Sequence, residues 1–247
     1  MSIGKIKNII LGIVYPIKCV GCGKSDILVC IDCLNKIKLR DDSVCPVCNR
    51  KSRYGEVHDW CRKDSFLDGV LIACEFDDKF LEKVIYIFKY NFVQSLDKEL
   101  SDLMIERIKE NDGFFEPKIT AGYFDYILSV PLHRYRFLWR GFNQAQSLVD
   151  KISAFLGLKS GQNFVVRKKY SSHQAGKTRH FREKSLEGAF GVDLKLTLEE
   201  RNEIKGKKIL LVDDVLTTGF TMQEVAKVLK NDLKTGEVWG IVIARSS

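Results

Sequence analysis

The sequence predicts an α/β protein in which helices flank a parallel β-sheet. A small cysteine-rich module that binds zinc precedes this part of the chain. Three observations predict this class. All eight cysteines lie before Phe76, β-branched strands alternate with amphipathic segments after about Phe66, and one strand ends in two adjacent aspartates. Strands that alternate with helices favour a parallel sheet with crossover helices. We therefore expect two parts, residues 1–65 and residues 66–247.

The composition is typical of a globular protein and excludes disordered, collagen-like and fibrous chains. Of 247 residues, 45% are hydrophobic and 29% charged, and 40 Lys+Arg against 32 Asp+Glu give a net charge of +8. The apolar tract Ile9–Ile17 is shorter than the ~20 residues of a membrane-spanning helix, and no small-residue cleavage site follows it. We expect a cytoplasmic protein without a transmembrane segment. The amphipathic start is expected to pack on its own protein rather than on a partner or a membrane surface; its apolar residues are Ile6, Ile10, Ile13 and Val14.

Six cysteines form three C-x2-C pairs, which is the spacing of zinc knuckles rather than of a disulfide framework. The pairs are Cys19/Cys22, Cys30/Cys33 and Cys45/Cys48, and Cys61 and Cys74 stand alone. The first two pairs supply four thiolates, enough for one closed, structural zinc site. A second site around Cys45, Cys48 and Cys61 needs a fourth ligand, which His58 or Asp64 can provide. Spacing alone also allows the pairs to interleave around one or two ions. We expect Cys74, in an apolar strand, to be a buried small side chain.

The predicted elements after the cysteines follow from hydrophobic periodicity. Strands are predicted at residues 70–73, 126–130, 208–212 and 238–244, and helical spacing at residues 81–88, 96–104, 145–156 and 222–229. Gly157 is predicted to end the third helical segment. The polar stretch Lys168–Glu187 shows neither the helical nor the strand periodicity of apolar residues, so it is predicted to be a loop.

The strongest local pattern is the run from Leu210 to Met222. An apolar strand delivers Asp213 and Asp214 to the carboxyl edge of the sheet, where ligands bind in open α/β folds. The turn that follows contains Thr217, Thr218, Gly219 and Thr221 and opens a helix, so its hydroxyl and N–H groups form an anion cradle. The aspartates can accept hydrogen bonds from sugar hydroxyls or hold hydrated magnesium. A sugar phosphate satisfies all these groups, although a Thr-capped helix also occurs for purely structural reasons.

This run resembles the phosphoribosyl-diphosphate motif of the type I phosphoribosyltransferases from end to end. A second segment is similar to the signature of the ComF family, phosphoribosyltransferase-like proteins linked to DNA uptake. It comprises Val130-Pro131-Leu132-His133-Arg134, then Arg136 and Arg140-Gly141-Phe142-Asn143-Gln144. Lys89-Tyr90, Gln174, Arg179, Arg182 and Gly188-Ala189-Phe190 match the same pattern. The resemblance spans essentially the whole chain.

The resemblance implies a type I phosphoribosyltransferase-like sheet that binds 5-phosphoribosyl 1-diphosphate with magnesium. It implies Asp213 and Asp214 as catalytic residues that hold the ribose. The implied ligand-binding residues are Thr217, Thr218, Gly219, Phe220 and Thr221 at the 5-phosphate, Val130, Pro131, Leu132, His133 and Arg134 at the leaving diphosphate, and Lys89, Arg140 and Arg179 as charge partners. No hood that would recognise an acceptor base is identifiable. His133, His173 and His180 are candidate proton donors, although a lone histidine in a polar loop is usually solvated.

The segment from Pro131 to Lys184 is strongly basic, with twelve Lys/Arg against two acids. Such a field suits a bound diphosphate and also a nucleic-acid backbone. Candidate DNA-binding residues are Arg134, Arg136, Arg140, Lys168 and Lys169; Phe137, Trp139, Phe142 and Tyr170 lie among the charges and either stack bases or belong to the core. Three functions therefore compete: a phosphoribosyltransferase, a non-catalytic single-stranded-DNA-binding accessory protein, and a zinc-stabilised scaffold that docks a helicase-type motor.

Overall fold

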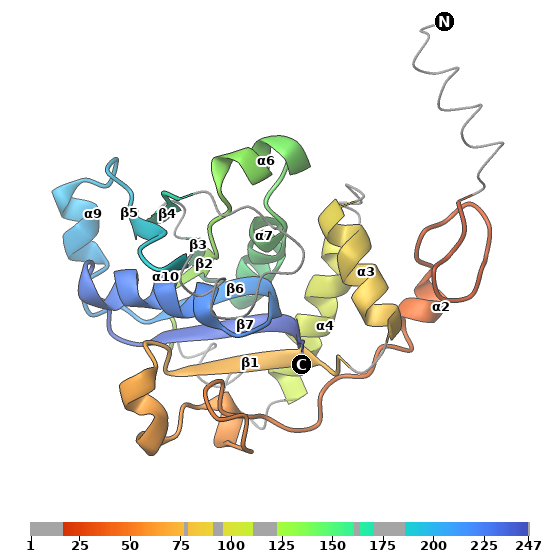
Figure 1. Cartoon of the computed structure of the whole chain (residues 1–247), viewed down its shortest axis with the longest axis horizontal. Helices are drawn as coiled ribbons and strands as arrows, with labels where there is room; N and C mark the ends of the chain where they lie inside the picture. The colour runs from red at the N-terminus through yellow and green to blue at the C-terminus, as the bar shows by residue number, and fades with distance from the viewer. Residues whose placement is uncertain are drawn as a thin grey trace, which may run out of the picture.

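The computed structural model describes residues 17–76, 79–90, 96–110, 123–160, 164–169 and 186–246 (Figure 1). The cysteine-rich part contains a short helix and two 3-10 turns: α2 (Ile31–Leu34), η1 (Arg53–Gly55) and η2 (Asp59–Asp64). The predicted loop from Lys168 to Glu187 lies mostly outside the described residues. Tyr170, His173, Gln174, Arg179, His180 and Arg182 therefore lie outside them as well.

The main sheet has five strands in the order β1-β7-β6-β2-β3, and every neighbouring pair is parallel. Its strands are β1 (Gly69–Cys74), β2 (Tyr126–Ser129), β3 (Lys159–Ser160), β6 (Ile209–Leu216) and β7 (Val238–Arg245). The four predicted strands are confirmed as β1, β2, β6 and β7. The strand β6 is longer than predicted, because Asp213, Val215 and Leu216 continue to pair with β7. The two aspartates therefore lie within the strand rather than after its end.

Helices cover both faces of the sheet (Figure 1). The helices α3 (Lys79–Tyr90), α4 (Leu96–Glu110) and α7 (Gln144–Leu156) pack on one face, and α10 (Phe220–Asn231) packs on the other. Two short helices, α6 (Arg134–Arg140) and α9 (Leu198–Glu203), lie outside these layers (Figure 1). The predicted end of α7 at Gly157 is confirmed, since this residue has a left-handed φ of 64°. The helices α6 and α9 were not predicted, because both are short and lack a repeating apolar face. A capping box of Thr197 and Glu200 begins α9.

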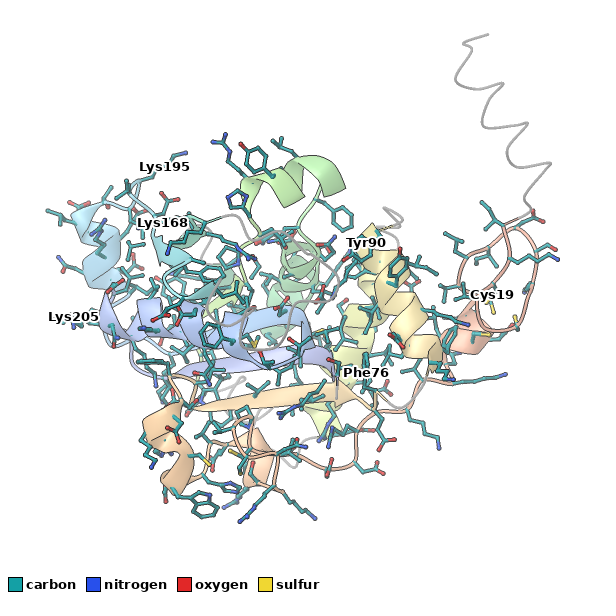
Figure 2. All side chains as sticks on the ribbon, in the orientation of Figure 1. Cys19, Phe76, Tyr90, Lys168, Lys195 and Lys205 are labelled. Atoms are coloured by element: carbon teal, nitrogen blue, oxygen red, sulfur yellow. The ribbon has the colours of Figure 1, made fainter. Side chains whose placement is uncertain are left out.

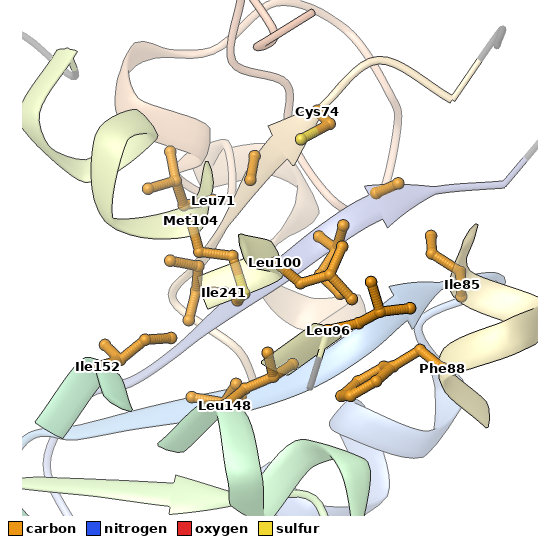
Figure 3. Packing of buried hydrophobic residues seen from close by; sticks show 14 of the residues in the cluster. Leu71, Cys74, Ile85, Phe88, Leu96, Leu100, Met104, Leu148, Ile152 and Ile241 are labelled. Atoms are coloured by element: carbon orange, nitrogen blue, oxygen red, sulfur yellow. The ribbon is translucent and has the colours of Figure 1, made fainter. Parts of the chain in front are cut away.

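Two apolar clusters hold the layers together. On one face, Leu100 of α4 and Leu148 of α7 are buried with Leu71 of β1 and Ile241 of β7 (Figure 3). The opposite face is covered by α10, which contributes Met222, Val225 and Leu229 to a second cluster. Because α7 follows β2 and α10 follows β6, the connections from two adjacent strands leave toward opposite faces of the sheet.

A small antiparallel hairpin lies beside the main sheet. Its strands are β4 (Val165–Arg167) and β5 (Phe190–Val192), and Val166 is in register with Gly191. Phe164 and Phe190 belong to the same cluster as the buried face of α10. The hairpin is therefore fixed to the α10 side of the sheet.

The cysteine-rich part packs along the β1 edge of the sheet. Val29, Leu34 and Ile37 belong to the same buried cluster as helices α3 and α4. Isolated antiparallel bridges join Leu39 to Cys74 and Glu56 to Gly69. The division at residues 65/66 remains a prediction. Within the described residues, none of the helices has the length and apolar character needed to cross a membrane.

Candidate active site and metal centres

The candidate active site lies where β2 and β6 separate. The last residues paired between these strands are Ser129 and Val212, and the N–H of Val130 donates to the carbonyl oxygen of Val212 over 2.9 Å. Beyond this point the two chains lead to helices on opposite faces. A crevice forms at such a topological switch point, and ligands of open α/β sheets bind there. Asp213 and Asp214 follow Val212 directly.

The two aspartates occupy different electrostatic environments. The Nζ of Lys89, from the end of α3, lies 2.9 Å from Oδ1 of Asp214, whose side chain is 11% exposed. Asp213 accepts a hydrogen bond from the N–H of Asp214 over 2.9 Å. Burial and the negative charge of Asp214 raise the pKa of Asp213 to about 7, although Lys89 and Arg167 oppose this shift. Burial alone would lower the pKa of Lys89, but Asp214 and Asp213 together raise it above its ordinary value. This group therefore brings one cation and two carboxylates together.

The position of Lys89 depends on the beginning of α7. The Gln144 side chain is buried, and its Nε2 donates to the backbone oxygen of Lys89 over 3.2 Å. Asn143 caps α7, accepting from the N–H of Ala145, and its Nδ2 lies 3.4 Å from Oγ of Ser129 at the end of β2. The segment that connects α6 to α7 therefore joins the end of α3 to the end of β2. This arrangement gives the predicted Asn143-Gln144 pair a positioning role.

The turn after β6 leads directly into α10, as the sequence predicted, and its role as an anion-binding hook stays a prediction. The N-cap residue of α10 is Gly219, which has a left-handed φ of 75° and makes no side-chain cap hydrogen bond. The hydroxyl of Thr218 lies 3.4 Å from the N–H of Phe220, and Thr217 is exposed. The first turn of α10 contains no acidic residue. Its N–H groups, like those of any helix start, attract an anion such as phosphate.

The segment Val130–Arg134 lies beside this crevice, but His133 does not have the solvated character expected for it. Its side chain is only 6% exposed, and its Nδ1 accepts from the N–H of Tyr135 at the start of α6. The expectation of a solvated histidine is wrong, because the unpredicted helix α6 needs an N-cap here. Arg134 is exposed, with its guanidinium 5.2 Å from the Tyr135 ring centre.

The structure describes the side chains of some of the other predicted cationic residues but not of all of them. Lys168 and Lys169 are exposed at the end of β4, where Nζ of Lys169 donates to the Glu187 backbone oxygen over 3.2 Å (Figure 2). Arg136 and Arg140 belong to α6, but their side chains lie outside the described residues. Arg179 lies outside them entirely. The predicted basic surface is therefore placed at Arg134, Lys168 and Lys169.

A cavity of about 560 Å³ opens beside the Val130–Arg134 segment. Its walls are the end of β2, helix α6, the beginning of α7, strand β4 and one residue of α10. The lining is mostly apolar and has no acidic side chain among the described residues; it comprises Leu128, Ser129, Pro131, Leu132, Arg134, Phe137, Asn143, Gln146, Phe164, Val165, Val166, Arg167 and Val225. The Oγ of Ser129 donates to Oε1 of Gln146 over 2.8 Å. The cavity can therefore receive a small, partly apolar molecule that also has polar groups.

Sequence reasoning missed Ser129, Gln146 and Arg167 as site residues. Arg167 stood in the basic segment, but a three-residue strand carries too little periodicity to predict the hairpin that brings it toward Asp213. Ser129 and Gln146 have no distinctive spacing. Ser129 and Gln146 line the same wall of the cavity because β2 lies next to α7, which only the fold shows.

The first metal centre is formed as predicted by Cys19, Cys22, Cys30 and Cys33, whose Sγ atoms all lie within 4.8 Å of one another. The Sγ of Cys30 lies 3.6 Å from that of Cys19 and 3.5 Å from that of Cys22. Tetrahedral zinc with Zn–S bonds of ~2.3 Å requires sulfur atoms ~3.8 Å apart, so the cluster fits this ion. Although burial opposes the shift, backbone N–H groups lower the pKa of Cys19 to about 6, which favours the thiolate that a metal needs.

In the second metal centre the fourth ligand is placed at His58 rather than at Asp64. The ligand atoms of Cys45, Cys48, His58 and Cys61 lie within 4.8 Å of one another, with Nδ1 of His58 3.3 Å from Sγ of Cys48. The other ring nitrogen, Nε2, lies 3.1 Å from the Lys51 backbone oxygen, a contact that orients histidine ligands of zinc. Asp64 is not part of the cluster. The two groups of zinc ligands do not share or exchange cysteines. None of the eight cysteines forms a disulfide.

Comparison with known proteins agrees with both parts of the chain. A phosphoribosyl transferase domain matches residues 140–233, and a double zinc ribbon domain matches residues 10–62. Competence protein F of Haemophilus influenzae is 27% identical over 87% of this chain and 90% of its own length. Competence protein ComFC of Bacillus subtilis is 25% identical over 90% of this chain and 86% of its own. The DNA utilization protein YhgH of Escherichia coli O6:H1 is 34% identical over 47% of this chain and 48% of its own.

Competence protein F and ComFC each match more than four fifths of this chain, so both alignments include parts of the cysteine-rich segment and of the sheet. The paired cysteine clusters fit the double zinc ribbon, and the five-stranded parallel sheet fits the phosphoribosyl transferase domain. The chain therefore has a phosphoribosyltransferase-type domain and an N-terminal double zinc ribbon, and it is similar to competence protein F and ComFC over most of its length.

Proposed function

We propose that this protein binds 5-phosphoribosyl 1-diphosphate with magnesium and transfers the phosphoribosyl group to a nitrogen acceptor, in a process linked to DNA uptake. One observation carries the proposal: Lys89, Asp213 and Asp214 meet at the crevice from which α10 also starts. The 5-phosphate binds the hook from Thr217 to Thr221. Asp213 and Asp214 hold the ribose hydroxyls, and the Val130–Arg134 segment holds the diphosphate.

In the proposed reaction, the bond between the anomeric carbon and the diphosphate breaks as a carbon–nitrogen bond forms. The diphosphate leaves with the electron pair, and the acceptor nitrogen loses a proton. Bound magnesium would neutralise charge on the leaving group. The protein contributes positioning and fixed charge, which account for most catalysis of this kind, so no protein nucleophile is needed. The cavity beside Pro131 and Arg134 is the space for the acceptor.

Isothermal titration calorimetry with phosphoribosyl diphosphate and magnesium tests this proposal. The parent protein should release or absorb heat with a saturating, one-site curve, and Asp213→Asn/Asp214→Asn should lose it. Asp232→Asn, which removes an exposed carboxylate at the far end of α10, is the matched control and should bind as the parent does. Absence of binding in the parent, or unchanged binding in the double variant, would contradict the assignment.

A second function, single-stranded-DNA binding, is favoured by the surface of α6. Phe137 is 49% exposed, Tyr135 is 54% exposed, and Arg134 lies beside them. Exposed aromatic rings next to cations are suited to base stacking along a charged groove. The names of the relatives, competence and DNA utilization proteins, support the same context. In this function the protein is an accessory of the uptake machinery, with or without transfer of phosphoribose, and a helicase-type motor is its proposed partner.

Filter binding of oligonucleotides across a salt series tests this second function. Lys168→Gln/Lys169→Gln should reduce the magnitude of the slope of log affinity against log salt by about 2. Phe137→Ala should weaken binding by ~1–3 kcal/mol without changing that slope. Phe155→Ala removes a similarly exposed ring from α7 and should have no effect. A salt-independent affinity would exclude electrostatic strand binding.

A further inference from the structure

A second groove lies away from the candidate active site, between the first zinc knuckle and α4. It encloses about 460 Å³, and none of its lining residues belongs to the sites described above. One wall is α2 and the strand-like segment after it, and the other is the outer side of α4. The lining residues used below are Ile31, Leu103, Lys98, Glu99, Asp102 and Glu106.

The α4 wall is acidic. Glu99, Asp102 and Glu106 recur at helical spacing, so their side chains form one stripe along the groove. Asp102 has a partner, since its Oδ2 lies 2.7 Å from Nζ of Lys98. Neither Glu99 nor Glu106 has a salt-bridge partner within the described part of the chain. The Oε2 atom of Glu99 is buried and, among the described residues, lacks a hydrogen-bond partner. This carboxylate oxygen requires a donor from elsewhere.

The facing wall leaves apolar surface uncovered. Ile31 of α2 is 56% exposed, and Ile17, where the described chain begins, is 50% exposed. Both residues lie in the same knuckle, because the Asp26 N–H donates to the Ile17 backbone oxygen over 2.8 Å and Cys30 immediately precedes α2. A partner for this groove must therefore combine apolar side chains with cations.

Residues 1–16 of this chain have that combination. Ile6, Ile10 and Ile13 recur at the spacing of one helix face before Pro16, and the segment contains two lysines, Lys5 and Lys7, and no acid. Fifteen residues before Pro16 would span ~22 Å as a helix, whereas the acidic stripe from Glu99 to Glu106 covers ~10 Å. The segment joins the described chain at Ile17, in the same zinc knuckle whose α2 forms one wall of the groove. Intramolecular binding of this kind has a high effective concentration.

We propose that residues 1–16 bind this groove in the same molecule, with their isoleucines against Ile31 and Leu103 and their lysines against Glu99 and Glu106. The bound segment stabilises the first zinc knuckle against α4. It also covers apolar surface that would otherwise attract another chain. The inference does not depend on the proposed transferase activity, since no residue of the candidate active site takes part.

Photo-crosslinking of the full-length, zinc-loaded protein tests the location. Benzoylphenylalanine at position 10 should crosslink within one chain to peptides from α2 or α4, as mass spectrometry identifies them. The same group at position 8, on the opposite side of the predicted helix, is the matched control and should give few such crosslinks. Crosslinks between two chains, or only to peptides outside the groove, would overturn the proposal in favour of another occupant.

Hydrogen exchange tests the charge contacts. Lys5→Glu/Lys7→Glu should increase exchange of the α4 amides about fivefold, and Glu99→Lys/Glu106→Lys in the same chain should restore protection. Lys63→Glu, a similar charge change in the other zinc knuckle, is the control and should leave α4 unchanged. Zinc content and circular dichroism verify that each variant is folded. Equal exchange in the parent and the lysine variant would contradict the proposal.

Discussion

Lys89 and Asp214 form an ion pair in which Nζ lies 2.9 Å from Oδ1, although one residue ends α3 and the other lies in β6. Burial and the negative charge of Asp214 raise the pKa of Asp213 to about 7, although Lys89 opposes this shift. The two adjacent carboxylates thus lie in different electrostatic surroundings. The ion pair brings the Lys89-Tyr90 motif of the sequence next to the Asp213-Asp214 motif in space.

Lys89→Met should weaken binding of magnesium and phosphoribosyl diphosphate about tenfold or more. The substitution leaves a part-buried carboxylate without its cation, and charge-assisted contacts of this kind are among the stronger polar interactions. Calorimetry measures the change. Lys83→Met, on the exposed side of the same helix, removes one positive charge from α3 and should bind normally. Equal losses in the two variants would mean that only net charge matters.

Asp213→Asn should raise the thermal midpoint of the magnesium-free protein at pH 8 but not at pH 4. The pKa of Asp213 is about 7 in the folded chain against an ordinary value of 3.8, so the folded state binds the proton more tightly. Its contribution to stability therefore falls as pH rises between those values and is lost above pH 7. Differential scanning fluorimetry of variant and parent across this range measures the difference. A difference that is constant with pH would contradict the assignment.

Gly219→Val should weaken phosphate binding as well as reduce stability. Gly219 has a φ of 75°, a conformation that costs a β-branched residue ~1–2 kcal/mol, and its distortion displaces the N–H groups of the hook. Gly157→Val is a matched control, because Gly157 also has a left-handed φ, of 64°, and open space around its Cα. Both variants should have lower thermal midpoints. Only the first should lose affinity for inorganic phosphate or phosphoribosyl diphosphate.

The sequence was sufficient to predict four strands of the sheet and the helix that follows β6, because β6 and α10 have long, regular apolar patterns. The spacing of the cysteine pairs also predicted the first zinc cluster, but it left open the fourth ligand of the second cluster and whether the pairs interleave. It could not predict α6, since the seven residues from Arg134 to Arg140 bury no repeating face and are defined by the His133 cap and by Gly141. Nor could it place Arg167 near Asp213, because that proximity depends on tertiary packing of a short hairpin. The choice of His58 over Asp64 likewise required the fold.

Replacing His58 separates the two zinc centres. The second centre contains Cys45, Cys48, His58 and Cys61, so His58→Cys should keep two zinc ions per chain and His58→Ala should lose or loosen one. Asp64→Ala is the control and should keep both, since Asp64 lies outside the cluster. Inductively coupled plasma mass spectrometry, with a chelator competition assay, counts the ions. Loss of zinc from Asp64→Ala with retention in His58→Ala would reverse the assignment.

The central claim is that a phosphorylated pentose binds where β6 meets α10. A crystal structure of the protein soaked with phosphoribosyl diphosphate and magnesium tests it most directly. We predict density for the 5-phosphate at the N–H groups of Gly219 to Thr221 and for the ribose hydroxyls at Asp213 and Asp214. Density for the ligand elsewhere, or an empty hook at saturating ligand, would contradict the account.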